Sequence, residues 1–220
     1  MSLFNHSISR AIASLLALLL LAPSFAMAGS YDDYFTAVKL DAPRELQQMI
    51  ARGLGPNMVE PEHGYTALML AIRLNSMNVV DLLLSNPDID LEAHAANGDT
   101  AIMLAAFYGY LPLVKSLLAR DVQINRPGWT ALHYAAINGN PHIIKELLDA
   151  SAYIDAESPD DKMTPLMLAA MRGRTGAVKL LTAEGADITL KNAAGLTALD
   201  LARKYKQADV IEEMTGAHTP

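Results

Sequence analysis

The chain has 220 residues, of which 51% are hydrophobic and 19% charged, a composition that fits a core-forming domain and excludes wholesale disorder. Its 17 Lys and Arg against 24 Asp and Glu give a net charge of −7, which disfavours binding to nucleic-acid phosphates. The absence of cysteine excludes thiol nucleophiles, thiolate metal sites and disulfide scaffolds.

The order of residues 1–28 is typical of a secretory signal peptide. A polar stretch ending at Arg10 precedes an apolar run at 11–22, and Ala26-Met27-Ala28 supplies the small residues of a cleavage site. This apolar run is shorter than the roughly 20 residues that span a bilayer, so we expect cleavage after Ala28; a retained membrane anchor is the alternative. Cleavage would leave residues 29–220 without a membrane span, in the periplasm of a Gram-negative source or secreted from another.

A short phrase recurs through the rest of the chain. It consists of Thr, then Ala or Pro, then Leu or Ile, and its threonines stand 34, 30, 34 and 33 residues apart: Thr66, Thr100, Thr130, Thr164 and Thr197. An Ala follows each threonine by five residues, and a Gly or Asn follows the first four by nine. We expect each Thr to cap a first helix, each Gly or Asn to end it, and a second helix with an inward apolar face to follow. Neighbouring helix pairs must stack, because one pair cannot bury its own apolar face.

This pattern resembles the ankyrin repeat, whose Thr-Pro-Leu-His-x-Ala signature is most complete at Thr130-Ala131-Leu132-His133-Tyr134-Ala135. The resemblance implies an all-α solenoid of about six helix-turn-helix units with short hairpin fingers, in which His133 hydrogen-bonds neighbouring backbone. Residues 29–220 form one domain in this reading, with units at about 31–60, 61–94, 95–124, 125–158, 159–191 and 192–216. The first unit lacks the Thr phrase and the last has Lys206 in place of the Gly, as expected of capping units.

Two connections depart from the common length. The 30-residue interval shortens the connection 125–130, so we expect a truncated finger there. The connection 155–163 is one residue longer and carries Glu157, Asp160 and Asp161, which predicts a projecting acidic tip.

Signatures of catalysis are missing from the sequence. It has no Gly-x-Ser-x-Gly elbow, no His-Glu-x-x-His, no phosphate-binding loop and no Rossmann fingerprint. The alternating acids of residues 88–92 lack the glycine and spacing of a calcium loop, so we expect them to face water. We predict no enzymatic activity, no cofactor and no metal site. A hydrolytic or metal-dependent enzyme that uses the acidic finger is a remote alternative.

The resemblance also implies a binding face, because fingers and first helices of ankyrin repeats line a concave side on which protein partners dock. The carried-over positions lie one residue before each Thr and seven and eight after it. Our predicted partner-binding residues are Tyr65, Arg73, Phe107, Tyr108, Trp129, Ile137, Met163, Met171 and Arg172. We expect the apolar ones to form one exposed strip rimmed by arginines and Asp99, since Trp, Tyr and Arg dominate binding hot spots. Packing between fingers that covers part of these rings, Trp129 above all, is the alternative.

These features together predict a non-catalytic, monomeric protein-binding module that acts outside the cytoplasm on a protein partner. The chain is similar to small exported bacterial ankyrin proteins, which implies a helper of a resident enzyme such as a catalase, or an immunity protein against a toxin. The alternative is a structural spacer or a self-associating scaffold.

Overall fold

The computed structural model describes residues 30–216, and the predicted signal peptide at 1–28 lies outside them. A helix at residues 30–39 is followed by eleven more: α2 (Pro43–Ala51), α3 (Ala67–Leu74), α4 (Met77–Ser85), α5 (Ala101–Tyr108), α6 (Leu111–Leu118), α7 (Ala131–Asn138), α8 (Pro141–Asp149), α9 (Pro165–Met171), α10 (Thr175–Ala183), α11 (Ala198–Lys204) and α12 (Ala208–Thr215). Within the described residues these helices form six consecutive pairs. The expected all-α solenoid of about six units is therefore confirmed.

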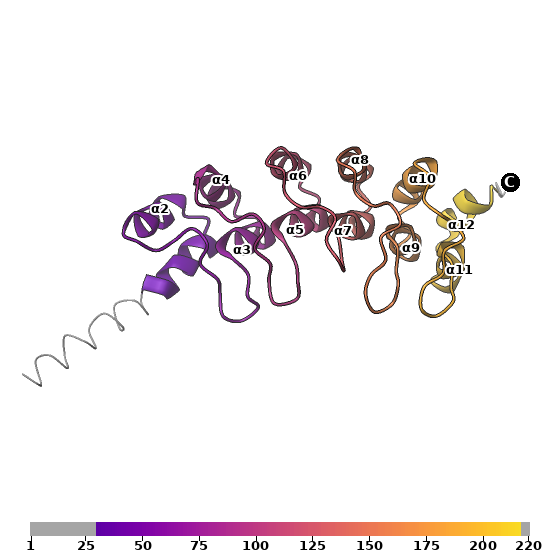
Figure 1. Cartoon of the computed structure of the whole chain (residues 1–220), viewed down its shortest axis with the longest axis horizontal. Helices are drawn as coiled ribbons and strands as arrows, with labels where there is room; N and C mark the ends of the chain where they lie inside the picture. The colour runs from indigo at the N-terminus through magenta and orange to yellow at the C-terminus, as the bar shows by residue number, and fades with distance from the viewer. Residues whose placement is uncertain (1–29, 217–220) are drawn as a thin grey trace, which may run out of the picture.

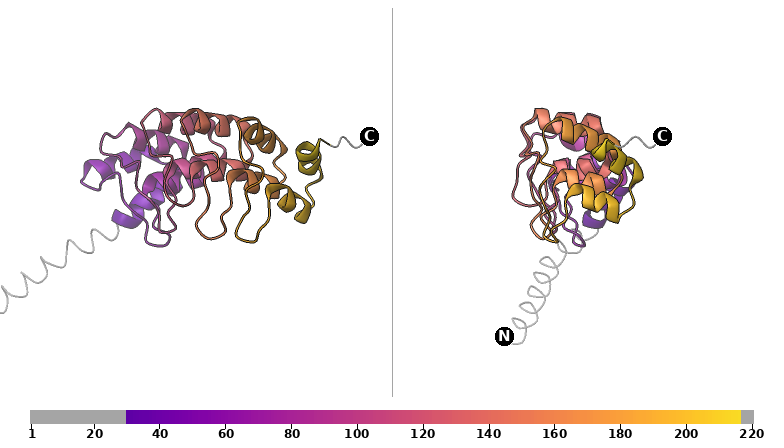
Figure 2. Two further views of the ribbon diagram at one scale, coloured as in Figure 1. Left: turned by 45° about the vertical axis from the view of Figure 1, so that its right-hand side comes forward. Right: turned by 90° about the vertical axis from the view of Figure 1, so that its right-hand side faces the viewer.

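The helices lie in two rows (Figure 1). Helices α3, α5, α7, α9 and α11 each pack on the next of that set and form the inner row, with residues 30–39 at its N-terminal end. Each outer helix packs on its inner partner, and the fingers hang from the inner row, all on the same side (Figure 2). We call the surface formed by the fingers and the exposed side of the inner helices the inner face. Within residues 30–216 no helix combines the length and the apolar composition needed to cross a bilayer.

Small side chains bring the two rows close together. The Ala five residues after each Thr is fully buried in every copy: Ala71, Ala105, Ala135, Ala169 and Ala202. Apolar pairs of the outer helices, such as Val79-Val80 and Ile143-Ile144, are buried against them. One continuous core runs through the array, as expected for units that each bury only part of their own apolar face.

All five repeat threonines stand at the N-cap of their helices, as predicted. Thr66, Thr164 and Thr197 accept hydrogen bonds from the backbone N–H three residues further on. At Thr130, the backbone N–H and the side-chain hydroxyl instead form hydrogen bonds with Nδ1 of His133, at 3.1 and 2.8 Å, respectively.

Thr100 is the N-cap of α5, but its buried hydroxyl has no hydrogen-bond partner among the described residues. Its backbone φ of −115° is close to the −119° of Thr130, but the third helical residue here is Met103, which offers no ring nitrogen.

The lengths of the fingers match the spacing of the repeat threonines in the sequence. Figure 1 shows a shorter loop before α7 than before the neighbouring inner helices. The longer finger before α9 is closed by Ser158, whose Oγ accepts a hydrogen bond from the Met163 N–H at 2.9 Å.

Three inner helices, α5, α7 and α9, each end under a side chain of the next unit. Asn138, Arg174 and Gln207 donate hydrogen bonds of 3.0 Å to the carbonyl oxygens of Phe107, Ile137 and Met171, respectively. These side chains pass over the glycines that end the helices, so a glycine satisfies two demands there. It adopts the left-handed conformation, and it leaves room for the neighbouring unit.

We expect Gly139→Ala to lower the free energy of unfolding by about 2–3 kcal/mol, because it incurs both a backbone and a packing penalty. Gly139 has φ of +89°, and a Cβ there would lie 2.6 Å from Cδ of Arg174, which must move and give up its hydrogen bond. Gly98 is the matched control: its φ is +87° but a Cβ would meet nothing within 4 Å, so Gly98→Ala should lower stability by only about 1 kcal/mol. Urea denaturation measures both, and equal losses would contradict the packing argument.

Candidate protein-binding face

Aromatic rings from two consecutive units meet on the inner face. Tyr110 stacks on Tyr108 at a centroid distance of 5.9 Å, and Tyr108 lies 5.2 Å from Phe107. Phe107 contacts Tyr134 at 5.9 Å, and Tyr134 contacts Trp129 at 5.8 Å. We call these five residues the aromatic ladder. It brings together three of the predicted binding residues, Phe107, Tyr108 and Trp129.

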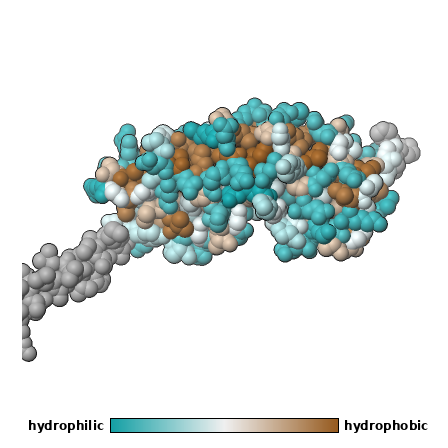
Figure 3. All heavy atoms as spheres, in the orientation of Figure 1, coloured by the Kyte–Doolittle hydropathy of each residue, from teal (hydrophilic) through white to brown (hydrophobic). Residues whose placement is uncertain are grey.

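The ladder is half accessible. Phe107, Tyr108 and Trp129 expose 38%, 36% and 37% of their surface, respectively, and each of them contacts another ring of the ladder. Trp129 also lies against the His133 ring at 5.4 Å. The same side chains thus contact one another and face solvent, and their part in partner binding stays a prediction. Figure 3 shows apolar surface gathered over the middle of the array, between the two rows of helices.

Two predicted binding residues are buried, so for them the expectation of exposure is wrong. Tyr65 is 8% exposed because its ring stacks on His63 and lies under the Arg73 guanidinium, 5.3 Å away. Met163 is 6% exposed because the next finger covers it, with Nδ2 of Asn192 donating to its sulfur at 3.4 Å. Their part in partner binding stays a prediction, limited to supporting neighbouring residues.

Sequence reasoning missed Tyr134, which links two units. It replaces the Leu found at the equivalent position of the other copies, at Leu70, Leu104, Leu168 and Leu201. Its hydroxyl donates to the carboxylate of Asp99, and burial together with this hydrogen bond raises the pKa of Tyr134 above its ordinary value. Asp99 also accepts from Nδ2 of Asn97 at 2.8 Å and is only 6% exposed, so the expectation that it rims the face is wrong. The single exchange of Leu for Tyr was a signal visible in the sequence.

The remaining predicted residues lie at the C-terminal ends of the inner helices. Ile137 and Met171 are half-buried, whereas Arg73 and Arg172 are exposed. Because the inner helices are neighbours in order, the ladder on α5 and α7 lies between Arg73 at the end of α3 and Arg172 at the end of α9.

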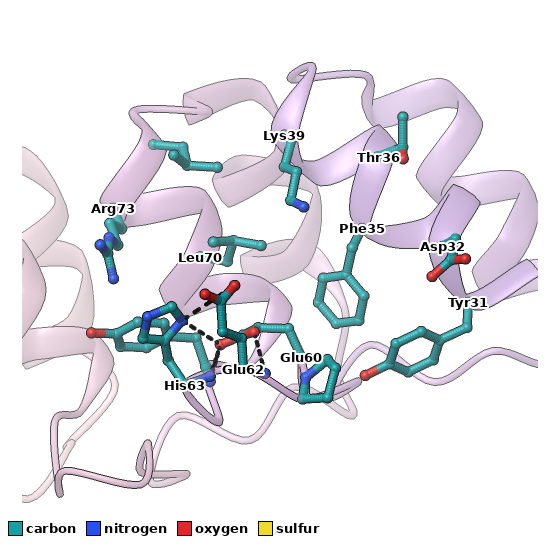
Figure 4. Close-up of a pocket in the computed structure, with 13 residues that line it drawn as sticks. Tyr31, Asp32, Phe35, Thr36, Lys39, Glu60, Glu62, His63, Leu70 and Arg73 are labelled. Carbon is teal, nitrogen blue, oxygen red and sulfur yellow. Dashed lines mark hydrogen bonds and ion pairs between the residues drawn. The ribbon is translucent and has the colours of Figure 1, made fainter. Parts of the chain in front are cut away.

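A pocket of about 690 Å³ adjoins this row at its N-terminal end, between residues 30–39, the first finger and α3 (Figure 4). Its apolar walls come from Tyr31, Phe35 and Leu70, and the cations Lys39 and Arg73 stand at its rim. The volume lies within the range of roughly 300–1,000 Å³ that is common for ligand pockets. No sequence pattern predicted this pocket, because residues 30–39 lack the repeat signature.

Three side chains of the types that can coordinate a metal ion lie together at the edge of this pocket: Glu60, Glu62 and His63. The Glu60 carboxylate accepts hydrogen bonds from the backbone N–H groups of Glu62, His63 and Tyr65 at 2.8, 2.8 and 3.2 Å. Burial alone would raise the pKa of Glu60, but these hydrogen bonds outweigh it and lower the pKa. The carboxylate thus closes the turn of the first finger, which explains its burial without a metal ion.

Comparisons with known proteins agree with this architecture. The family model described as ankyrin repeats (3 copies) matches residues 35–127, 87–160, 121–192 and 154–218. Tyrosine-protein kinase Shark of Drosophila melanogaster is 30% identical over 192 residues, which are 86% of this chain and 20% of Shark. The human SH3 and multiple ankyrin repeat domains protein 2 is 31% identical over 167 residues, covering 74% of this chain and 9% of that protein.

The nuclear factor NF-kappa-B p105 subunit of Gallus gallus is 30% identical over 182 residues, which are 80% of this chain and 18% of that protein. The chain thus spans at most 20% of the length of these three relatives. The matched models cover nearly all described residues, and the helix pairs, capping threonines and fingers repeat in the same register. The chain belongs to the ankyrin-repeat family.

Proposed function

We propose that this protein is a non-catalytic module that binds a partner protein through its inner face, outside the cytoplasm. The observation that carries the proposal is the half-exposed aromatic ladder between Arg73 and Arg172. Aromatic and arginine side chains supply most binding hot spots, and a ladder fixed by its own ring contacts loses little conformational freedom when a partner docks. Ankyrin repeats are protein-interaction modules, which supports the same assignment.

A binding role also agrees with how the fold uses its buried titratable side chains. Glu60 closes a finger turn, Asp99 accepts the hydroxyl hydrogen of Tyr134, and His133 joins two units. Each of these groups is engaged in a structural hydrogen bond rather than aimed into the pocket as an acid, base or nucleophile.

The signal-like order of residues 1–28 supports export, and export leaves two roles for the complex. A helper would keep a resident enzyme such as a catalase active. Deleting this protein would then lower the activity of that enzyme, and the purified chain would not inhibit the enzyme directly. An immunity protein would inhibit a toxin one to one. Activity assays with and without the purified chain separate these roles.

The proposal is tested by the double variant Phe107→Ser and Tyr108→Ser. After cross-linking and mass spectrometry identify the partner, we expect the double variant to lose about 2–4 kcal/mol of binding free energy, because both rings are hot-spot types at the centre of the face. Tyr153→Ser is the matched control, since Tyr153 is exposed in the connection after α8, away from the ladder.

Circular dichroism of both variants checks that the array stays folded. Unchanged affinity in a folded double variant would contradict the proposal. Sedimentation of the purified chain addresses the scaffold alternative: we expect a monomer, and a dimer that the double variant abolishes would favour self-association instead.

A further inference from the structure

Charged side chains are distributed differently over the two rows of helices. On the outer row, Nζ of Lys115 lies 2.8 Å from the Glu146 carboxylate, and Nζ of Lys145 lies 2.6 Å from Asp149. Lys145 also pairs with Glu184 at 3.3 Å. These cations are already neutralised by carboxylates of the same molecule.

On the inner row, Arg203 of α11 lies 3.9 Å from the Asp200 carboxylate, but the arginines at the ends of α3 and α9 lack such partners among the described residues. Helices α3, α5, α7 and α9 contain no acidic residue, and Asp200 of α11 is engaged with Thr197 as a helix cap. Within residues 30–216, neither Arg73 nor Arg172 lies within ion-pair distance of a carboxylate. The base of the inner face is therefore cationic, although the whole chain carries a net charge of −7.

The pocket beside Arg73 is lined by charges of both signs, because Asp32, Glu60 and Glu62 lie in it together with Lys39 and Arg73. Lys39 stands on its rim opposite the first finger, exposed and without a carboxylate partner among the described residues (Figure 4). Lys39 and Arg73 thus flank an apolar hollow that acidic residues also line, so this end of the inner face has room for an apolar side chain next to two cations.

Acidic side chains of the fingers do not cancel these cations. Glu60 and Asp99 are buried and hydrogen-bonded within their own fingers and to Tyr134. Glu62 lines the pocket, where its carboxylate lies 3.9 Å from Nδ1 of His63, and Asp160 and Asp161 belong to the finger before α9, which extends away from the inner helices (Figure 1). A partner that lies along the helices meets the cations and the ladder first.

We propose that the partner occupies the inner face with an extended acidic segment whose carboxylates meet Arg73 at one end and Arg172 at the other. Apolar or aromatic side chains between these carboxylates pack on the aromatic ladder, and one next to Arg73 enters the pocket beside Lys39. Three interhelical steps of about 9 Å separate α3 from α9, and an extended chain rises about 3.3 Å per residue, so the segment has roughly eight residues. This inference rests on the proposed function and names the chemistry of its partner.

The test uses an array of synthetic peptides of that length with Glu at both ends and apolar or aromatic centres. Otherwise identical peptides carry Gln or Lys at the ends. We expect only the Glu-ended peptides to bind the purified chain, with an affinity that falls at least about tenfold between about 50 and 500 mM NaCl, because salt screens exposed charges. Binding by the Gln- or Lys-ended peptides to the same degree, or no binding by the Glu-ended ones, overturns the inference.

Arginine variants locate the interaction. Arg73→Gln and Arg172→Gln should each weaken binding of the Glu-ended peptides at least about fivefold, the usual effect of removing a charge-assisted contact. Arg120→Gln is the matched control, because Arg120 is exposed just after the outer helix α6. Cations at helix C termini also interact favourably with the helix dipole. Variants that have a lower melting temperature but bind the peptides with unchanged affinity would show that the arginines only stabilise their helices. This result would overturn the inference.

The same variants separate the two proposals once the partner is known. If Phe107→Ser with Tyr108→Ser releases the partner while both arginine variants keep it, the acidic segment is wrong and the proposed function stands. If all of these variants keep the partner, both fail.

Discussion

Ile144→Ala is expected to lower the free energy of unfolding by about 3–4 kcal/mol, within the range for truncating a fully buried aliphatic side chain. Ile144 exposes 0% of its surface in α8, near the middle of the array. The substitution removes three carbons from a core that packs α7, α8 and α10 together, and the neighbouring helices can fill the cavity only in part. Because each unit is stabilised by its neighbours, damage to a central unit weakens two interfaces at once.

The same chemical change at Ile188 is the control. Ile188 is 49% exposed in the connection after α10, so Ile188→Ala should change stability by no more than about 0.5 kcal/mol. Urea denaturation at one pH compares the two variants. Similar losses at the two positions would mean that the core does not run through α8 as described.

His133→Ala should have an effect of similar size, about 3 kcal/mol, because His133 joins two units through both ring nitrogens. Nδ1 accepts the backbone N–H of Thr130 at 3.1 Å, which leaves Nε2 to donate to the carbonyl oxygen of Met163 at 3.0 Å. Alanine leaves these two backbone groups buried without partners and opens a cavity. His133→Met should destabilise less, by about 1–2 kcal/mol, because Met occupies the equivalent positions 69, 103 and 167 and fills the space.

The His133→Met variant also tests how His133 makes the stability of the protein depend on pH. Burial lowers the pKa of His133, although its hydrogen bond to Met163 partly opposes the shift. A lowered folded-state pKa means that the unfolded chain binds the proton first, so stability contributed by this residue falls as the pH drops below about 6.5. The slope is at most about 1.4 kcal/mol per pH unit.

Denaturation of the parent chain and His133→Met at pH values on both sides of 6.5 should show a smaller acid loss in the variant. The pH-dependent stability contributed by the other histidines cancels in this comparison, because both chains contain them. Equal acid losses would mean that folding does not lower the pKa of His133.

The repeat phase predicted much of the fold because its signals are local. A capping Thr, a buried Ala and a helix-ending Gly each act within a few residues of their own position, and Ala71 through Ala202 are buried as the pattern requires. Even Lys206, which replaces the Gly, adopts the left-handed conformation with φ of +58°.

The site was predicted less completely because it depends on contacts between units. Met163 is buried by Asn192 of the next finger, and Tyr134 meets an Asp that lies 35 residues earlier. Neither contact follows from the position of a residue within its own repeat. The pocket depends on residues 30–39, which have no repeat signature, so only the three-dimensional arrangement placed Lys39 beside Arg73.

Position-specific photo-cross-linking in the producing cells tests the central claim most directly. A photoreactive phenylalanine analogue at Tyr108 keeps an aromatic ring on the inner face, and the same analogue at Tyr153 probes the exposed connection after α8. The account predicts a covalent adduct with one defined protein from position 108 and none from position 153. An adduct from position 153 alone, or none from either position, would contradict binding through the inner face.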